Sequence, residues 1–278
     1  MNKEKFSVCM SVYKNDKPEF LVEALNSLFD QSVVPTEIVL VEDGPVTEEL
    51  ERVVVGFETR FPTIMNVIRC KKNGGLGTAL RIGVENAHYD LIARMDSDDI
   101  SHPERFEKQI KFMNEHPNVD ICGGDAAKFE KTTNDIIGYR RPKFTDEELK
   151  KQLQDKTPFC HVTVMAKKDA ILKSGNYVEI FNQEDYYLWI RMAKEGCIFA
   201  NIPNVLVYVR LVGVGSRRGG WKYFKNEMFL QNYLLKSRII GIPKYLRHVV
   251  TKFIIQIIMT PKMREFAYET LIKVREKK

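Results

Sequence analysis

Three aspartates that directly follow a short apolar run constrain this chain more than any other stretch of its sequence. Residues 90–100 read DLIARMDSDDI, in which apolar side chains lead straight into Asp96, Asp98 and Asp99. Apolar residues on both faces are typical of a parallel strand that is covered by helices on each side. Carboxylates gathered at the end of such a strand repel one another, so a cation is expected among them. Oxygen ligands suit Mg²⁺ or Mn²⁺, and open α/β sheets bind ligands at this edge, so the stretch predicts a metal–nucleotide site.

The alternative interpretation is that these aspartates only begin a helix. Ser101, Pro103 and Glu104 form a capping-box pattern at the start of PERFEKQIKFMNEH, residues 103–116. Because Ser101 can cap that helix alone, the pattern leaves Asp96 and Asp98 without a structural task. This favours the metal site.

The first hundred residues alternate between strand and helix patterns with short connections. Strand patterns lie at 6–13, 37–42, 64–70 and 91–95, and helical patterns lie at 19–31, 47–60 and 77–87. The alternation predicts an α/β fold with a doubly wound parallel sheet and right-handed crossovers. Tyr13, Asp43 and Asp96 lie at the carboxyl ends of three of these strands. Because the carboxyl ends of parallel strands meet at one edge, we expect these residues in one nucleotide-binding site.

A glycine-containing segment, KNGGLGTALRIG at 72–83, leaves two interpretations open. It matches neither the dinucleotide fingerprint nor the P-loop, because it lacks the GK[ST] of the latter. Gly74 and Gly75 allow a tight turn, and backbone amides of the following helix can hold an anion. Glycine pairs before helices are also common as plain turns. The segment is therefore either a phosphate-binding loop or a simple turn.

The second half of the chain carries a different pattern. A strand with a bend at Gly123-Gly124 is expected at 119–129, a helix at 146–153, an alternating strand at 157–168 and a helix at 182–196. Glu184 and Asp185 fall in the first turn of the last helix, where acidic residues stabilise the helix dipole. That position is expected to lower the Asp185 pKa, which leaves either a structural carboxylate or an ionised base. His161, taken alone, is interpreted as a hydrogen-bonded, half-buried histidine.

The net charge of +6 is unevenly spread. Residues 216–278 contain 15 Lys/Arg and 4 Asp/Glu, a balance of +11, whereas the remaining 215 residues contain 28 Lys/Arg and 33 Asp/Glu, a balance of −5. A basic tail on a mildly acidic body indicates an anionic partner for the tail.

The five cysteines are widely spaced with no CxxC pair, which favours buried thiols in a reducing cytosol. We expect no signal peptide, and no stretch of the ~18–20 apolar residues that a membrane-spanning helix needs.

The tail contains two helical patterns separated by Gly241 and Pro243. The second, within 244–264, has apolar residues on one helical face bordered by basic ones, namely Lys244, Arg247, Lys252, Lys262 and Arg264. A helix of this kind suits the surface of an anionic bilayer. A helix that packs on the rest of the chain or on a partner subunit has the same periodicity. Nucleic acid is not expected as a partner, because no recognition module accompanies the charge.

Six segments carry a further resemblance when they are taken in order along the chain: VCMSVYKND, VEDG, NGGLGTALRIG, ARMDSDD, FCHVTVM and NQEDYYLWIRM. As a set they strongly resemble family 2 inverting glycosyltransferases, and most of all the bacterial enzymes that build capsular or exopolysaccharide repeat units. The implied fold is a GT-A-type α/β fold, a doubly wound, mostly parallel sheet with a C-terminal helical extension. The implied division is a GT-A domain at 1–215, with a nucleotide-binding half at about 1–100 and an acceptor half at about 101–215. A basic amphipathic helical tail follows at 216–278.

The resemblance implies roles position by position. The donor-site residues it implies are Val12 and Tyr13 beside the base, Asp43 on uracil, Asn73 and Arg94 near the base or diphosphate, and Asp96 on the ribose or donor sugar. Asp98 is implied to hold the divalent metal, Mn²⁺ or Mg²⁺, with Asp99 as a helper. Asp185 is the implied general base. Glu184, Trp189 and His161 belong to the implied acceptor site.

These roles imply metal-dependent transfer of a hexose or N-acetylhexosamine from a UDP-sugar to a glycan acceptor carried on polyprenyl diphosphate. The protein is expected in the cytoplasm, peripheral at the inner face of the cell membrane. Many such enzymes add a late histidine to the metal shell, but residues 205–220 contain none. Arg210, Arg217 and Arg218 either contact the diphosphate or belong to a loop that orders on donor binding. A nucleotidyltransferase and a non-catalytic sugar- or nucleotide-binding subunit are the alternatives.

Overall fold

The computed structural model describes residues 4–180, 182–211, 220–260 and 262–264. The strands are β1 (Phe6–Val12), β2 (Glu37–Glu42), β3 (Met65–Arg69), β4 (Leu91–Met95), β5 (Ile100–Ser101), β6 (Ile121–Phe129), β7 (Ile136–Arg140), β8 (Met165–Lys167) and β9 (Phe199–Arg210). The helices are α1 (Pro18–Phe29), α2 (Glu48–Arg60), α3 (Leu76–Asn86), α4 (Arg105–Glu115), α5 (Asp146–Gln152), α6 (Lys168–Lys173), α7 (Glu184–Lys194), α8 (Trp221–Lys236) and α9 (Ile242–Phe253). A 3₁₀ turn, η1 (His161–Thr163), and a π turn, η2 (Ile254–Ile258), complete them.

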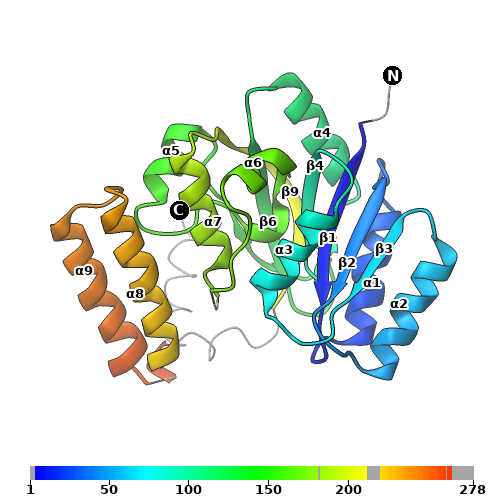
Figure 1. Cartoon of the computed structure of the whole chain (residues 1–278), viewed down its shortest axis with the longest axis horizontal. Coiled ribbons are helices and arrows are strands. Elements are labelled where there is room, and N and C mark those ends of the chain that lie inside the picture. Colours follow the sequence, from blue (N-terminus) through cyan, green and yellow to red (C-terminus); the bar gives the residue numbers. More distant parts are fainter. Residues whose placement is uncertain (1–3, 181, 212–219, 261, 265–278) are drawn as a thin grey trace. The chain divides into compact units, whose positions relative to one another are not determined.

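The nine strands of the described residues form one mixed sheet (Figure 1). Its order is β3-β2-β1-β4-β8-β6-β9-β5, and β7 pairs with β6. Strands β3, β2, β1 and β4 are parallel neighbours, joined in the chain through α1, α2 and α3. Strand β8 runs antiparallel to both β4 and β6, and β6 is parallel to β9. The predicted α/β fold with a doubly wound sheet is confirmed, and β8 inserts an antiparallel strand where its two halves meet.

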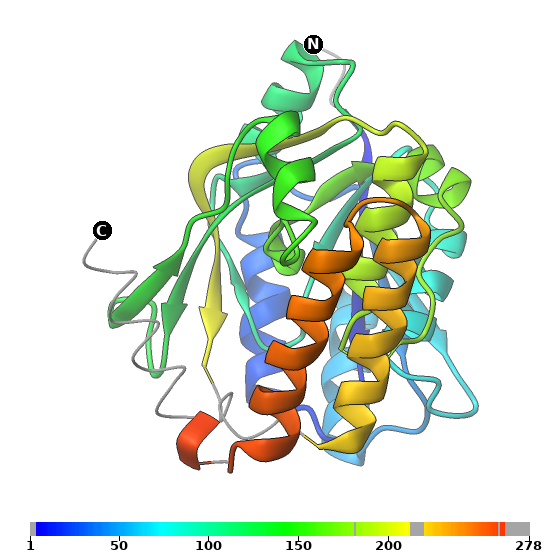
Figure 2. The ribbon, with the colours of Figure 1, turned by 90° about the vertical axis from the view of Figure 1, so that its left-hand side faces the viewer.

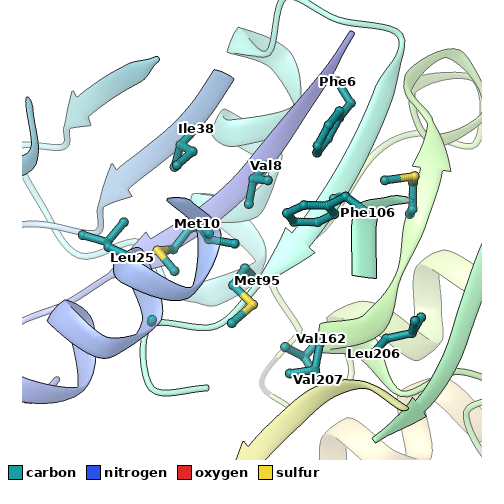
Figure 3. Close-up of a cluster of buried hydrophobic side chains, with 14 of the residues drawn as sticks. Phe6, Val8, Met10, Leu25, Ile38, Met95, Phe106, Val162, Leu206 and Val207 are labelled. Carbon is teal, nitrogen blue, oxygen red and sulfur yellow. The ribbon is translucent and has the colours of Figure 1, made fainter. Parts of the chain in front are cut away.

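Both faces of the parallel part of the sheet are covered. On one face, Phe6 and Val8 of β1 are buried with Phe106 of α4 (Figure 3), and the rings of Phe6 and Phe106 lie 4.8 Å apart between centroids. On the other face, α3 packs so closely that a Cβ added at Gly83 would lie 3.5 Å from the side chain of Cys9. This double coverage explains why β1 and β2 are apolar on both sides.

The capping box predicted at Ser101 is wrong. Residues Ile100 and Ser101 form β5, where they pair with β9. The Ser101 amide donates to Ser27 Oγ at 3.0 Å, and the buried Ser101 Oγ has no hydrogen-bond partner. Helix α4 starts later, at Arg105, without a side-chain cap. Strand pairing over a long sequence distance thus takes the residue that local pattern assigned to the helix.

The strand predicted at 157–168 is also wrong over most of its length. His161 lies in the 3₁₀ turn η1, which closes where the Thr163 amide and hydroxyl both bond to Cys160 O, at 2.9 and 2.8 Å. Only Met165–Lys167 forms a strand, β8. The bend predicted at Gly123-Gly124 appears as shifts in the register between β6 and β9 on either side of Asp125.

A second unit consists of residues 180–183 together with the chain after Arg210. In its described part, α8 and α9 lie side by side (Figure 2). Polar contacts between them include a hydrogen bond from Tyr245 Oη to Asn232 Oδ1 at 2.7 Å and a contact of 2.8 Å between His248 Nδ1 and Gln231 Oε1. Within the described residues, the helices lack the length and apolar character needed to cross a bilayer.

Candidate active site

Hydrogen bonds connect the loops at the carboxyl edge of the parallel strands. After β1, Asp16 accepts from Ser97 Oγ, which follows β4, at 2.8 Å. The Asp43 amide, after β2, donates to Val12 O at 2.8 Å, and Asp43 Oδ1 accepts from the Gly74 amide at 2.6 Å. The predicted convergence of strand ends at one edge is therefore present, and four loops build it.

Asp96, Asp98 and Asp99 form a compact acidic cluster on the loop after β4. Each can offer a carboxylate oxygen within 4.8 Å of the others. Burial, followed by the negative charges of Asp96 and Asp98, raises the pKa of Asp99 well above its ordinary value. Burial likewise raises the pKa of Asp98, and the charge of Asp96 adds to it. Carboxylates this close together repel one another when they are ionised, and a divalent cation bound between them would relieve that repulsion. Their oxygen atoms are ligands that Mg²⁺ and Mn²⁺ prefer.

Arg94 provides the positive charge beside this cluster. Its guanidinium is buried at 4 % exposure and forms an ion pair with Asp96, while its Nε has no hydrogen-bond partner. The same positive charge favours the ionised forms of Glu184 and Asp185. The positive charge of Arg94 thus acts both on the acidic cluster and on the two carboxylates at the start of α7.

The two carboxylates at the start of α7 differ in environment. Glu184 is buried, and burial followed by the neighbouring charge of Asp185 raises its pKa to about 7. Asp185 is only partly buried, and Thr157 Oγ1 donates to its Oδ2 at 3.3 Å. The helix amide does lower the Asp185 pKa, as expected from its position. Desolvation by burial outweighs this amide, Arg140 and Arg94, so the net pKa is raised. Of the two residues, Asp185 is the more exposed.

An aromatic cluster lies beneath this end of α7. His161 Nε2 lies 3.0 Å from Tyr177 Oη, and the rings of His161 and Trp189 meet edge-on at 5.9 Å. Burial lowers the pKa of His161 well below its ordinary value, so the imidazole is neutral. The interpretation of His161 as a half-buried, hydrogen-bonded residue is confirmed. Trp189 is 0 % exposed, so it can influence an acceptor only through the side chains that pack on it.

The residues assigned to the nucleotide base divide into exposed and buried ones. Tyr13 is 39 % exposed, and Asn73 is exposed while its Nδ2 donates to Asp43 O at 3.0 Å. The Val12 side chain belongs to the hydrophobic core, so only its backbone is available to a ligand. Asp43 is buried, and its carboxylate is already engaged by the glycine segment.

The amides of the glycine segment are occupied by carboxylates of this chain. Asp43 Oδ1 and Oδ2 accept from the amides of Gly74 and Gly75 at 2.6 and 3.0 Å. Glu179 Oε2 accepts from the Gly77 amide at 2.8 Å, at the start of α3. Gly75 has φ +87°, a left-handed conformation that side chains rarely adopt, and an added Cβ would collide with Glu179. In this structure the segment is a turn that binds carboxylates, and these amides are not open to phosphate.

Arg210 closes the acidic cluster from the end of β9. Its amide donates to Asp99 Oδ1 at 2.9 Å and its Nε to Asp98 O at 3.0 Å, while its guanidinium also pairs with Glu23. Arg210 therefore fixes the aspartate loop from within the sheet domain. Arg217 and Arg218 lie outside the described residues.

Sequence reasoning missed four polar residues of this site: Asp16, Arg140, Thr157 and Glu179. Asp16 is the most informative, because burial raises its pKa to about 6 and the charges of Asp98 and Asp96 contribute. The available signal was its position, an acidic residue in the turn after a strand that ends at the same edge. Thr157 and Glu179 had no comparable signal, since their partners lie 28 and 102 residues away in sequence.

Comparison with protein families gives one decisive match. The model of glycosyl transferase family 2 matches residues 7–174, which is more than half of the chain and includes the whole acidic cluster. The chain belongs to glycosyltransferase family 2. The family match ends before α7, so Glu184, Asp185 and Trp189 lie beyond it.

Two curated relatives extend over almost the whole family 2 chain. Amylovoran biosynthesis glycosyltransferase AmsE of Erwinia amylovora is 36% identical over 265 residues, covering 95% of this chain and 98% of its own. The UDP-Gal:alpha-D-GlcNAc-diphosphoundecaprenol beta-1,3-galactosyltransferase of Escherichia coli is 33% identical over 270 residues, covering 97% of each chain. Both alignments span most of the region that the family match leaves out.

A solved structure supports the GT-A fold. The structure of S. aureus TarS 1-349 in complex with UDP-GlcNAc has a TM-score of 0.68 and 17% sequence identity, covering 90% of this chain and 72% of that one. At this identity the similarity shows the fold alone. It agrees with the predicted GT-A architecture.

Proposed function

We propose that this family 2 glycosyltransferase is a metal-dependent, inverting enzyme that transfers a hexose or N-acetylhexosamine from a UDP-sugar to a lipid-linked glycan. The observation that carries the proposal is that the buried guanidinium of Arg94 interacts with two acidic sites. It forms an ion pair with Asp96 of the acidic cluster, and its charge also acts on Asp185. A charged donor and a base for the acceptor need such neighbouring sites.

In this proposal the acidic cluster holds Mn²⁺ or Mg²⁺ through Asp98, with Asp96 and Asp99 beside it. The ion, when bound, stabilises the negative charge that grows on the leaving diphosphate. Asp96 is also the residue proposed to meet the ribose or donor sugar. Arg94 holds the Asp96 carboxylate through their ion pair and keeps positive charge next to the diphosphate.

Asp185 is the proposed general base. Its carboxylate accepts the proton of the acceptor hydroxyl as that oxygen attacks the anomeric carbon, and the bond to the diphosphate breaks on the opposite side. A single displacement of this kind inverts the anomeric configuration and requires no covalent nucleophile. Thr157 orients the Asp185 carboxylate through its hydrogen bond, and Glu184 and His161 border the acceptor site behind it.

The uridine part of the proposal rests on Tyr13, Asn73 and Asp43. Tyr13 offers an exposed ring for stacking, and Asn73 lies next to Asp43. Each carboxylate oxygen of Asp43 has a second lone pair, so uracil can be bound while the glycine amides remain bonded. The relative from Escherichia coli uses UDP-Gal, as its name states, which supports a UDP-sugar as donor.

The acceptor proposed for this chain is supported by the same relative, whose name gives an acceptor carried on diphosphoundecaprenol. We place this chain at the cytoplasmic face of the cell membrane, with a polyprenyl-diphosphate-linked acceptor in cell-surface polysaccharide synthesis. The role of AmsE in amylovoran biosynthesis supports a polysaccharide product. All five cysteines are free thiols, as suits a reducing compartment.

The donor half is tested by calorimetric titration of the full-length protein with UDP and with other nucleoside diphosphates, with and without Mn²⁺. We expect binding that is selective for UDP and strengthened by Mn²⁺, and we expect Asp98→Asn to remove the Mn²⁺ effect. Asp90→Asn is the matched control, because this exposed aspartate precedes β4 whereas the cluster follows it. Affinity for UDP that is the same with and without Mn²⁺ would disprove the metal assignment.

The transfer half is tested with a panel of UDP-sugars and a lipid-linked glycan acceptor, with NMR of the product. We expect the new bond to have the anomeric configuration opposite to that of the donor. Retention of configuration would rule out direct displacement. In a parallel reaction supplied with UTP and a sugar 1-phosphate, release of pyrophosphate would indicate the nucleotidyltransferase alternative. UDP binding without turnover of any donor would indicate the non-catalytic alternative.

A further inference from the structure

The outer face of α9 is apolar although it is exposed. Ile242, Leu246 and Val250 are 65, 55 and 57 % exposed, and Ile254 and Ile258 continue the same four-residue spacing at 44 and 62 %. At a rise of about 1.5 Å per residue the stripe is about 24 Å long. Contiguous exposed apolar surface of this length marks an interaction site.

The most buried positions of α9 and of η2 after it are polar. His248 in α9 and Gln256 in η2 are the residues of these two elements that are buried. His248 contacts Gln231, Gln231 Nε2 donates to Glu227 Oε1 at 3.0 Å, and Lys252 pairs with Glu227 at 3.2 Å. A surface helix normally turns its apolar side inward. Here polar contacts, together with the packing of Phe253 on Trp221 and Phe224, attach α9 to α8, and the exposed aliphatic residues lie outside that contact.

The charge around this face indicates the nature of its partner. Residues 228–264 contain no Asp or Glu and seven basic residues, namely Lys236, Arg238, Lys244, Arg247, Lys252, Lys262 and Arg264. Two of the predicted border residues are used within the unit: Lys252 pairs with Glu227, and Arg264 donates to Met259 O at 2.8 Å. By its sequence the segment therefore carries a net charge of +7 with His neutral.

The charge and the apolar surface together distinguish between three possible partners of this face: a second copy of the chain, nucleic acid and a lipid bilayer. A second copy of the chain would bring two such basic segments together, and like charges oppose that contact. Nucleic acid would use the basic residues but has no need of a stripe of five aliphatic side chains. An anionic lipid surface uses both, because headgroups attract the basic residues while the apolar face enters the acyl boundary.

We infer that the outer face of α9 and η2, defined by Ile242, Leu246, Val250, Ile254 and Ile258, binds the surface of an anionic lipid bilayer without spanning it. Trp221 extends this surface: it is 59 % exposed and lies edge-on to Phe253, with ring centroids 6.3 Å apart. Tryptophan is favoured at the headgroup level of a bilayer. This binding needs neither donor nor acceptor.

The test is flotation of the full-length protein with vesicles of phosphatidylcholine alone and of phosphatidylcholine mixed with phosphatidylglycerol, each at low and high salt. We expect binding to the anionic vesicles that weakens with salt. The affinity of the double variant Leu246→Gln/Val250→Gln for the anionic vesicles should be lower by a factor of at least about ten. Val55→Gln is the matched control, because Val55 is a 42 % exposed aliphatic residue on α2.

Equal binding to both kinds of vesicle, no binding to either, or unchanged binding by the double variant would overturn the inference. A dimer in light scattering that the double variant abolishes, with no vesicle binding, would assign the face to a second copy and overturn it as well. UDP binding is measured on the same samples. Vesicle binding that fails while UDP binding persists refutes this inference and leaves the proposed reaction standing.

Discussion

The contact between Asp43 and the glycine segment gives the prediction that can be worked out in most detail. Asp43 is buried at 7 % exposure and accepts two backbone hydrogen bonds, from Gly74 and Gly75 at 2.6 and 3.0 Å. A hydrogen bond to a charged group contributes about 1.5–3 kcal/mol, so two contribute about 3–6 kcal/mol. The Gly74 amide is on an exposed residue and recovers water when the carboxylate is removed. We therefore expect Asp43→Ala to lower the free energy of unfolding by about 2–4 kcal/mol.

Asp43→Asn is the partner variant, because it keeps one acceptor oxygen. Its expected loss is about half as large, about 1–2 kcal/mol. The free energies are measured by urea unfolding, compared only where the slopes agree. Hydrogen exchange of the Gly74 and Gly75 amides reports the local effect directly and should speed up in both variants.

The control for Asp43 is Asp30→Ala, an exposed aspartate at the end of α1, which should change stability by less than about 0.5 kcal/mol. A loss in Asp43→Ala as small as that of the control, with unchanged exchange at both glycines, would refute the reasoning. The carboxylate would then not be what holds the glycine segment. Loss of UDP affinity without loss of stability would assign Asp43 to the ligand alone.

Three further predictions follow from the same structure. Asp185→Asn should keep UDP binding and lower the transfer rate by about 10²–10⁴-fold, since a general base contributes that much; turnover near that of the wild type would exclude it as the base. Thr145→Ala should lower the free energy of unfolding by about 1 kcal/mol, because Thr145 and Glu148 form a complete capping box on α5. Ser101→Ala should leave the free energy of unfolding unchanged, since the buried Ser101 hydroxyl has no hydrogen-bond partner. Equal losses for the two variants in urea unfolding would contradict this. The pKa of Glu184, raised to about 7 from 4.5, means that the native state holds this proton more tightly than the unfolded chain does. The contribution of Glu184 to stability is therefore fully present below pH 4.5 and is lost, by up to about 3 kcal/mol, as the pH rises from 4.5 through 7. Glu184→Gln should remove that fall, and parallel pH curves for variant and wild type would disprove it.

The sequence predicted the architecture well because its signals are local. Strand and helix periodicity placed β1 to β4 and the three helices between them to within a few residues. The rule that parallel strands end at one edge then predicts that Tyr13, Asp43 and Asp96 lie at the same edge of the sheet. Ser101 and His161 were misplaced for the opposite reason: β5 pairs with a strand more than a hundred residues away, and the η1 turn breaks an alternation that looks like a strand.

The sequence by itself thus determined the sheet of family 2, the acidic cluster at its edge and the amphipathic character of α9, because each depends on spacing along the chain. The tertiary structure alone decided which groups satisfy one another and which are removed from water. It placed Asp43 and Glu179 on the glycine amides, raised the pKa of Asp185 against the influence of its helix, and turned the polar side of α9 inward. Hydrogen-bond partners and desolvation arise from residues far apart in the sequence, and no local pattern encodes them.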